Sequence, residues 1–194
     1  MRYAIGLASG AMTLAMTLIL AGCGGGEKSV TAQNASTAEV AQKVKEAGIV
    51  DDKFISPGRW QMQMTVTDMQ IPGMPPAMAQ KMKAQMGPGR SFQHCVTPEE
   101  AKKPQEDFFA GEQAKSCRYE KFAMGDGKIN MIMHCAQGGS RQTVKMDGTY
   151  APDSYHMTMA STMEGQPGSP TAGMHFNATV DAKRLGVCTG KEPG

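Results

Sequence analysis

Apolar and polar residues alternate strictly through much of the chain from residue 60 onward. In the first run, residues 60–67, tryptophan, methionine and valine alternate with glutamine and threonine. A period of two is typical of a half-buried β-strand, because successive side chains of a strand point to opposite faces. The same kind of pattern predicts six later strands, at residues 92–96, 117–124, 128–135, 144–150, 155–163 and 174–180. Seven one-sided strands with mostly short links predict a mainly β fold, an antiparallel meander forming a sandwich or a partly closed barrel.

Two or three short helices are expected beside these strands. Ser36-Thr37-Ala38-Glu39 has the spacing of a capping box, in which the serine and the glutamate satisfy backbone groups at the start of a helix. Val40 and Val44 then share one face, so we expect a helix over residues 37–47 that docks on the domain. A membrane-surface helix is the alternative, but its apolar stripe is thin.

A second helix is predicted over residues 77–86, after Pro76, which is acceptable only in the first turn of a helix. Met78, Met82 and Met86 recur every four residues, so this helix is amphipathic with a methionine stripe. Thr97-Pro98-Glu99-Glu100 begins a short third helix, in which Thr97 is the N-cap and Pro98 takes the first position.

The strands from residue 117 to 135 predict a hairpin with one irregularity. Asp126-Gly127 suits a two-residue type I′ turn. With that turn, Met124 and Phe122 point inward, but so do Tyr119 and Cys117, which a strict period of two would point outward. One extra residue near Glu120-Lys121 is required to turn them inward. A bulge there would place Tyr119 opposite Met133 and Cys117 opposite Cys135. Asp147-Gly148 lies within a regular alternation and is also predicted to mark a bulge.

The N-terminus predicts an exported, lipid-anchored protein. Residues 4–21 carry no charge, follow Arg2, and end in Leu20-Ala21-Gly22-Cys23. This stretch resembles the lipobox of bacterial lipoproteins, so we expect residues 1–22 to be a signal peptide and Cys23 to carry a diacylglycerol. A permanent membrane-spanning helix is the alternative, but the run is barely long enough and is interrupted by glycines.

The predicted mature chain begins with a tether. From Gly24 to about Asn34 the residues are small and polar, so we expect a flexible spacer, followed by the helix and, over residues 57–190, the β domain. Gly24 is not the aspartate that signals inner-membrane retention in the enteric lipoproteins this sequence resembles. The predicted location is therefore the cell envelope, on the periplasmic face of the outer membrane.

Charge argues against nucleic acid as a partner. The predicted signal removes 22 of 194 residues and one of the 20 basic residues, leaving 19 basic against 18 acidic residues and a net charge of +1. No basic run stands out, whereas nucleic-acid-binding proteins concentrate lysine and arginine on one face.

Four cysteines remain once Cys23 is assigned to lipid. An even number of thiols in an exported domain predicts two disulfides with three possible connectivities. The hairpin register favours Cys117–Cys135, which leaves Cys95–Cys188. The alternative, Cys95–Cys117 with Cys135–Cys188, stays open because three of these cysteines would lie at one end of the sheet.

Several segments together resemble a known bacterial family. They are Pro57-Gly58-Arg59-Trp60, Met74-Pro75-Pro76-Ala77-Met78, Cys95-Val96-Thr97-Pro98-Glu99-Glu100-Ala101, Cys117-Arg118-Tyr119-Glu120-Lys121-Phe122, Gly148-Thr149-Tyr150 and Arg184-Leu185-Gly186-Val187-Cys188. The chain resembles the domain of unknown function 3617 over about residues 55–188. This resemblance implies an exported, often lipid-anchored envelope protein, and it implies no activity.

Motifs for catalysis are missing from the sequence. It contains no Gly-x-Ser-x-Gly, no His-Glu-x-x-His and no phosphate-binding glycine loop. His94 beside Cys95 could suggest a thiol nucleophile, but a cysteine in a four-cysteine exported domain is better explained by a disulfide. We therefore expect a protein that is not an enzyme and needs no cofactor.

Methionine is the unusual residue, with 18 in the chain. Methionines and histidines adjoin at four places, Met62-x-Met64, Met131-x-Met133-His134, His156-Met157-x-Met159 and Met174-His175, and thioethers favour Cu(I). However, the histidines have the opposite strand parity, and two sulfurs at i and i+2 lie about 7 Å apart. Methionine as an adaptable core filler is the simpler explanation, so no metal ligands are assigned.

The predicted function is binding of something apolar in the periplasm. A half-barrel lined by flexible methionines suits a lipid or another apolar client, with the 77–86 helix as a lid over its mouth. A helix that merely closes the core is the alternative arrangement. Copper binding and a passive envelope scaffold remain alternative functions, and the lipid anchor makes the membrane a partner in each.

Overall fold

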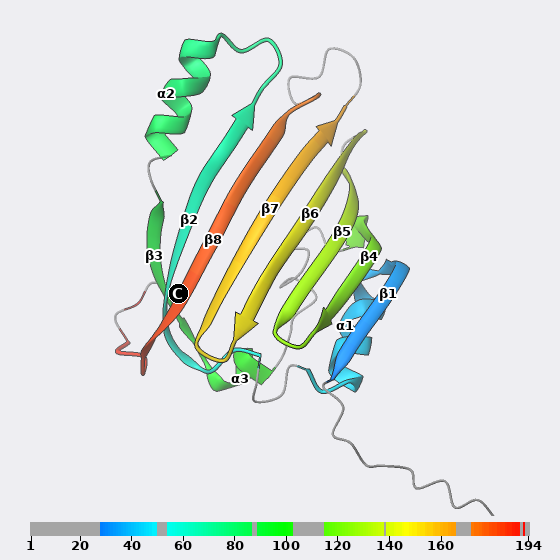
Figure 1. Cartoon of the computed structure of the whole chain (residues 1–194), viewed down its shortest axis with the longest axis vertical. Helices are drawn as coiled ribbons and strands as arrows, with labels where there is room; N and C mark the ends of the chain where they lie inside the picture. Colours follow the sequence, from blue (N-terminus) through cyan, green and yellow to red (C-terminus); the bar gives the residue numbers. More distant parts are fainter. Residues whose placement is uncertain are drawn as a thin grey trace, which may run out of the picture.

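One open antiparallel sheet dominates the structure. The computed structural model describes residues 28–49, 54–86, 89–102, 115–137, 139–165, 172–190 and 192. Within these residues eight strands form a single sheet that does not close, in the order β1-β4-β5-β6-β7-β8-β2-β3 (Figure 1). The strands are β1 Ser29–Ser36, β2 Gly58–Gln70, β3 Arg90–Val96, β4 Cys117–Gly125, β5 Lys128–Gln137, β6 Ser140–Ala151, β7 Ser154–Glu164 and β8 His175–Gly186. The helices are α1 Thr37–Glu46, α2 Pro76–Met86 and α3 Pro98–Lys102.

The mainly β, antiparallel prediction is confirmed. Strands β4 to β8 form a meander in sequence order, and β8 then pairs with β2, whose other neighbour is β3. All seven strands expected from the alternation are present. Short hairpins allow this arrangement, because antiparallel neighbours need only a tight turn between them. None of the helices in the described part of the chain is long and apolar enough to span a membrane.

The structure corrects the extent of the predicted flexible tether. Residues 29–36 form β1, which pairs with β4 along its length, from Ser29 opposite Gly125 to Ser36 opposite Arg118. Val30, Ala32 and Ala35 of β1 are buried in the core. Alanine is a weak hydrophobic signal, and Asn34 adopts a positive φ of 50° that breaks the period of two, so the alternation in this strand is concealed.

Helix α1 follows β1 without a linker and confirms the predicted capping box. The Glu39 backbone N–H donates to Ser36 Oγ (3.2 Å), and the Ser36 backbone N–H donates to Glu39 Oε2 (2.6 Å). Val40 and Val44 are fully buried, as the helix packs against β1 and β4. Figure 1 shows α1 behind these two strands. The helix therefore docks on the sheet, as expected.

The core lies between α1 and the β1, β4 and β5 side of the sheet. Its largest fully buried side chains there are Tyr119, Phe122 and Met131. Tyr119 stacks edge to face on Phe122 at a centroid distance of 5.3 Å. Desolvation raises the pKa of the Tyr119 hydroxyl well above its usual range. Three buried methionines complete this cluster, so methionine replaces much of the aromatic volume of a typical core.

The predicted β4–β5 hairpin and its bulge are confirmed. Asp126 and Gly127 have φ values of 52° and 69°, as a type I′ turn requires. The register shifts once, between Tyr119 and Lys121, and Tyr119 then lies opposite Met133. Because of this shift, the side chains of Tyr119 and Cys117 point to the same side of the sheet as those of Phe122 and Met124.

Both preferred disulfides are present. Cys117–Cys135 joins β4 to β5 with a Cα–Cα distance of 4.0 Å, and Cys95–Cys188 joins β3 to the segment that follows β8, with a Cα–Cα distance of 5.6 Å. The alternative connectivity is therefore wrong. The two bonds fasten opposite ends of the strand order, one beside the α1 core and one at the β3 edge.

The predicted bulge at Asp147-Gly148 is wrong. Both residues lie in an unbroken ladder, with Asp147 opposite Asn130 and Gly148 opposite Ile129. A Cβ on Gly148 would lie 2.3 Å from Met157 Sδ and 2.4 Å from the His156 carbonyl oxygen. Glycine is needed here for the close approach of β7, not for an extra residue.

Candidate ligand-binding surface

Beyond the α1 core, the inner side of the sheet continues as a surface rich in methionine. Met131 lies opposite Met146, and Met146 lies opposite Met159, so one row of side chains crosses β5, β6 and β7. The next row joins Met157 to Val180 and Val180 to Met64. We call this surface the methionine face, defined by Met62, Met64 and Met69 on β2, Met146 on β6, and Met157, Met159 and Met163 on β7.

The methionine face is only half-covered. All seven of its methionines are half-buried, and Met146, Met157 and Met159 border the core. Among the described elements, α1 packs against β1 and β4 and α2 against β2, whereas no helix packs extensively against β6, β7 or β8. An apolar sheet surface of this extent in an otherwise polar protein is typical of a site that meets a partner or a ligand.

A rigid aromatic pair closes one end of the methionine face. Trp60 is 2% exposed, and its indole Nε1–H donates to the Ser56 carbonyl oxygen (2.9 Å). Tyr155 stacks on Trp60 at a centroid distance of 5.9 Å, and its hydroxyl donates to Met62 Sδ (2.9 Å). Burial raises the pKa of the Tyr155 hydroxyl above its usual range. These contacts fix the position of Met62 relative to the rest of the face.

Glycine 148 shapes the centre of the face. The Met157 sulfur occupies the place that a Gly148 side chain would take. The flexible thioether thus lies over the backbone of β6 and fills a gap between two strands. The sequence pattern identified Met157 as inward, but the role of the glycine beside it was missed.

Three of the four histidines, His134, His156 and His175, lie on the opposite, polar face of the sheet, whereas His94 lies opposite Trp60 on the same side as the methionine face. His156 Nδ1 lies 2.7 Å from Asp181 Oδ1, and His134 Nε2 lies 2.7 Å from Glu120 Oε2. His175 Nδ1 lies 3.3 Å from Thr162 Oγ1. These positions confirm that the side chains of these three histidines and of their neighbouring methionines emerge on different sides. Within the described residues, no group of three or more histidine, cysteine, aspartate or glutamate side chains could hold a metal ion.

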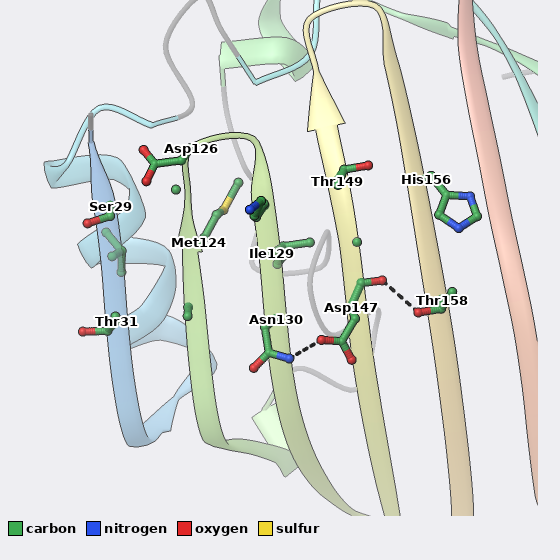
Figure 2. A pocket seen from close by; sticks show the side chains of 15 residues that line it. Ser29, Thr31, Met124, Asp126, Ile129, Asn130, Asp147, Thr149, His156 and Thr158 are labelled. Carbon is green, nitrogen blue, oxygen red and sulfur yellow. Dashed lines mark hydrogen bonds between the residues drawn. The ribbon is translucent and has the colours of Figure 1, made fainter. Parts of the chain in front are cut away.

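A shallow depression of about 500 Å³ lies over β1, β4, β5, β6 and β7 on the polar face (Figure 2). Small polar side chains supply much of its lining. Asn130 donates to Asp147, and Thr158 Oγ1 donates to the Asp147 carbonyl oxygen (3.1 Å). Two further depressions, of about 560 and 520 Å³, are lined largely by polar residues, and none of the three includes a residue of α2.

Helix α2 does not form the predicted lid. It begins at Pro76 as expected, but it lies at the β2–β3 edge of the sheet and not across the methionine face (Figure 1). Met78, the first residue of the stripe, is 56% exposed. Met82 is half-buried, and the main contacts of α2 among the described elements are with β2, so the helix lies beside the sheet and not over the methionine face.

Cys23 lies outside the described residues, with the predicted signal peptide and the start of the tether. The lipidation site therefore stays a prediction. The other four predicted site residues, Cys95, Cys117, Cys135 and Cys188, form the two disulfides.

The fold defines a disulfide-linked, mainly β protein with one open antiparallel sheet. The family model for a protein of unknown function, DUF3617, matches residues 55–188, and the chain belongs to this family. The match confirms the resemblance inferred from the sequence and its boundaries. No curated protein and no solved structure matches the chain significantly.

Proposed function

We propose that this protein is a lipid-anchored envelope protein that binds an apolar molecule, such as a lipid acyl chain, on its methionine face. The observation that carries the proposal is the half-buried, continuous apolar surface of β2, β6, β7 and β8. Unbranched, polarisable methionine side chains adapt to ligands of irregular shape, as they do at other promiscuous binding surfaces. The role proposed is binding and not catalysis.

The location is proposed from the sequence. Leu20-Ala21-Gly22-Cys23 supports processing before Cys23 and anchoring by a diacylglycerol, and Gly24 supports the outer membrane, facing the periplasm. Metabolic labelling with an alkyne-bearing palmitate analogue tests the anchor. The wild-type protein should be labelled and the Cys23→Ser variant should not, and density-gradient fractionation should place the labelled protein with the outer membrane. Labelling that persists in Cys23→Ser would contradict the anchor.

Ligand binding is best tested in two steps. Native mass spectrometry of the Cys23→Ser protein, secreted to the periplasm, should reveal a retained mass in the range of a lipid. Binding of N-phenyl-1-naphthylamine, a dye that fluoresces in apolar surroundings, should then be competed by palmitate.

Matched variants locate the binding surface. Met64→Gln and Met69→Gln place a polar amide of similar size on the methionine face, so each should weaken dye binding about tenfold. Met78→Gln on the exposed side of α2 is the control and should bind as the wild type does. Equal loss in all three variants would contradict the location, and a Cys23→Ser protein that binds neither lipid nor dye would refute apolar binding.

Cu(I) binding is a second candidate because of one row of sulfurs. Met131, Met146 and Met159 lie opposite one another on three neighbouring strands, which are about 4.8 Å apart. Two methionines at i and i+2 of one strand lie about 7 Å apart, too far to share one ion, whereas methionines on neighbouring strands lie closer together. Thioethers also favour Cu(I). Stoichiometric copper that survives a competing chelator under anaerobic conditions, and is lost in Met146→Leu, would support this site. If neither lipid nor copper is retained, a passive scaffold becomes the proposal to pursue.

A further inference from the structure

The sulfur atoms of the described chain fall into groups of very different accessibility. The four cysteines are joined in disulfides. Met124, Met131 and Met133 of the core are 2%, 1% and 4% exposed. The seven methionines of the methionine face are half-buried, as are Met74, Met82 and Met174, and Met78 on α2 is exposed. The accessible, unoxidised sulfurs in this part of the protein are therefore thioethers, and most of them lie on one surface.

We propose that the methionine face is a site of oxidation by hypochlorous acid, and that its conversion to methionine sulfoxide abolishes the binding of apolar ligands. This inference rests on the proposed function, since it concerns the same surface. In the net step, one thioether and one HOCl give one sulfoxide, one chloride ion and one proton. The sulfur loses two electrons and forms an S–O bond, while the chlorine is reduced to chloride and leaves.

The chemistry of the product explains the loss of binding. Oxidation converts a flexible apolar side chain into a polar one, which disrupts methionine-rich interfaces. An apolar ligand on the oxidised face would have to desolvate the sulfoxide oxygens without offering them a hydrogen bond. Several sulfoxides on one surface would act together, so we expect dye affinity to fall by about tenfold or more.

The burial of the core methionines should allow binding to be lost without unfolding of the protein. The core methionines are screened from the oxidant by α1 and by the sheet itself, so the fold should survive while the methionine face reacts. Trp60, another oxidisable side chain, is 2% exposed and is also protected. Met62 differs from its neighbours because its sulfur accepts a hydrogen bond from the Tyr155 hydroxyl. A sulfur lone pair held in this way is a weaker nucleophile, so Met62 should react more slowly than Met64.

The test is an oxidation series on the Cys23→Ser protein. Aliquots receive increasing equivalents of sodium hypochlorite, are quenched with free methionine, and are divided among peptide mass spectrometry, near-ultraviolet circular dichroism and the dye-binding assay. Met64, Met69, Met163 and Met78 should oxidise first, and the core methionines should stay unmodified while the near-ultraviolet spectrum is native. Dye affinity should fall in step with oxidation of the methionine face.

Two variants assign the loss to this surface. A triple variant with Met64→Leu, Met69→Leu and Met163→Leu stays apolar but cannot form sulfoxides at these positions, so its dye affinity should fall much less on treatment, relative to its own affinity before treatment, than that of the wild type. Met78→Leu should lose affinity as the wild type does. Dye binding that survives oxidation of the methionine face, or core methionines that react first in the native protein, would overturn this inference alone. Untreated protein that binds no dye would overturn the proposed apolar binding as well.

Discussion

Replacement of Gly148 by alanine tests how closely β6 and β7 approach. Gly148 does not have a positive φ, so alanine is permitted by the backbone and should gain about 0.4–1 kcal/mol from reduced freedom of the unfolded chain. Against this, the new Cβ would lie 2.3 Å from Met157 Sδ and 2.4 Å from the His156 carbonyl oxygen. The thioether can rotate away, but the carbonyl belongs to the neighbouring strand and cannot. Overpacking of this kind costs about 1–3 kcal/mol, so the net loss of stability should be about 1–2 kcal/mol.

Urea denaturation of the variant with both disulfides intact, without hypochlorite treatment, measures this loss as a lower midpoint with an unchanged slope. Gly165→Ala is the control, because its nearest contacts would be 3.2 Å and lie on side-chain atoms. The double variant Gly148→Ala with Met157→Ala removes the sulfur clash but leaves the carbonyl clash, and so should remain destabilised. A Gly148→Ala protein as stable as the wild type would refute the close-approach explanation.

Three further measurements test other parts of the structure. Cys117→Ala with Cys135→Ala opens a link of 18 residues and should cost about 3 kcal/mol, whereas removal of the other disulfide, which spans 93 residues, should cost more, about 4–5 kcal/mol; equal urea midpoints would contradict the loop-entropy argument. Ser36→Ala should lower the free energy of unfolding by about 1 kcal/mol through loss of the α1 cap, and no change would show that the cap is dispensable. The side chain and backbone of Thr189 donate hydrogen bonds that lower the pKa of Glu192 from 4.5 to about 2. The contribution of the Glu192 carboxylate to stability is therefore complete above pH 4.5 and is lost as the pH falls toward 2. Acid titration of Glu192→Gln should accordingly show a smaller loss of stability between these pH values than the wild type shows. An unchanged titration would contradict this assignment.

The hairpin and its disulfide could be predicted because they depend on local rules. The turn residues Asp126-Gly127 fix the register, and the period of two then leaves only one way to bring Tyr119 and Cys117 inward. A single unpaired residue satisfies both constraints. The disulfide followed from this geometry, because it joins two positions that the register places opposite each other.

Strand β1 and helix α2 could not be placed in the same way. β1 pairs with a strand about 90 residues later in the chain, and its buried positions include Ala32 and Ala35, which signal burial weakly. In α2 the spacing of Met78 and Met82 shows that they share a face, but not what that face meets. Periodicity identifies the side of an element, and only tertiary packing decides whether that side is covered.

The candidate surface was predictable in part for the same reason. Strand parity placed Met157 and Met159 on one side of the sheet and His156 on the other, as the structure shows. The half-exposure of the methionine face was not predictable, because it depends on where the helices pack, and none of the described helices packs extensively against β6, β7 or β8. Glycine 148 was misassigned because a bulge and a close strand approach both favour glycine inside a strand.

The position of β1 sets how far the protein can reach under the proposed lipid anchor. The sheet begins at Ser29, so only residues 24–28 separate it from Cys23. Even a fully extended chain spans about 3.5 Å per residue, which limits the distance from Cys23 to Ser29 to about 20 Å. With so short a tether, the anchored domain would stay at the surface of its own membrane. Transfer of an apolar ligand to the opposite membrane would then require a second carrier protein that takes the ligand from this domain.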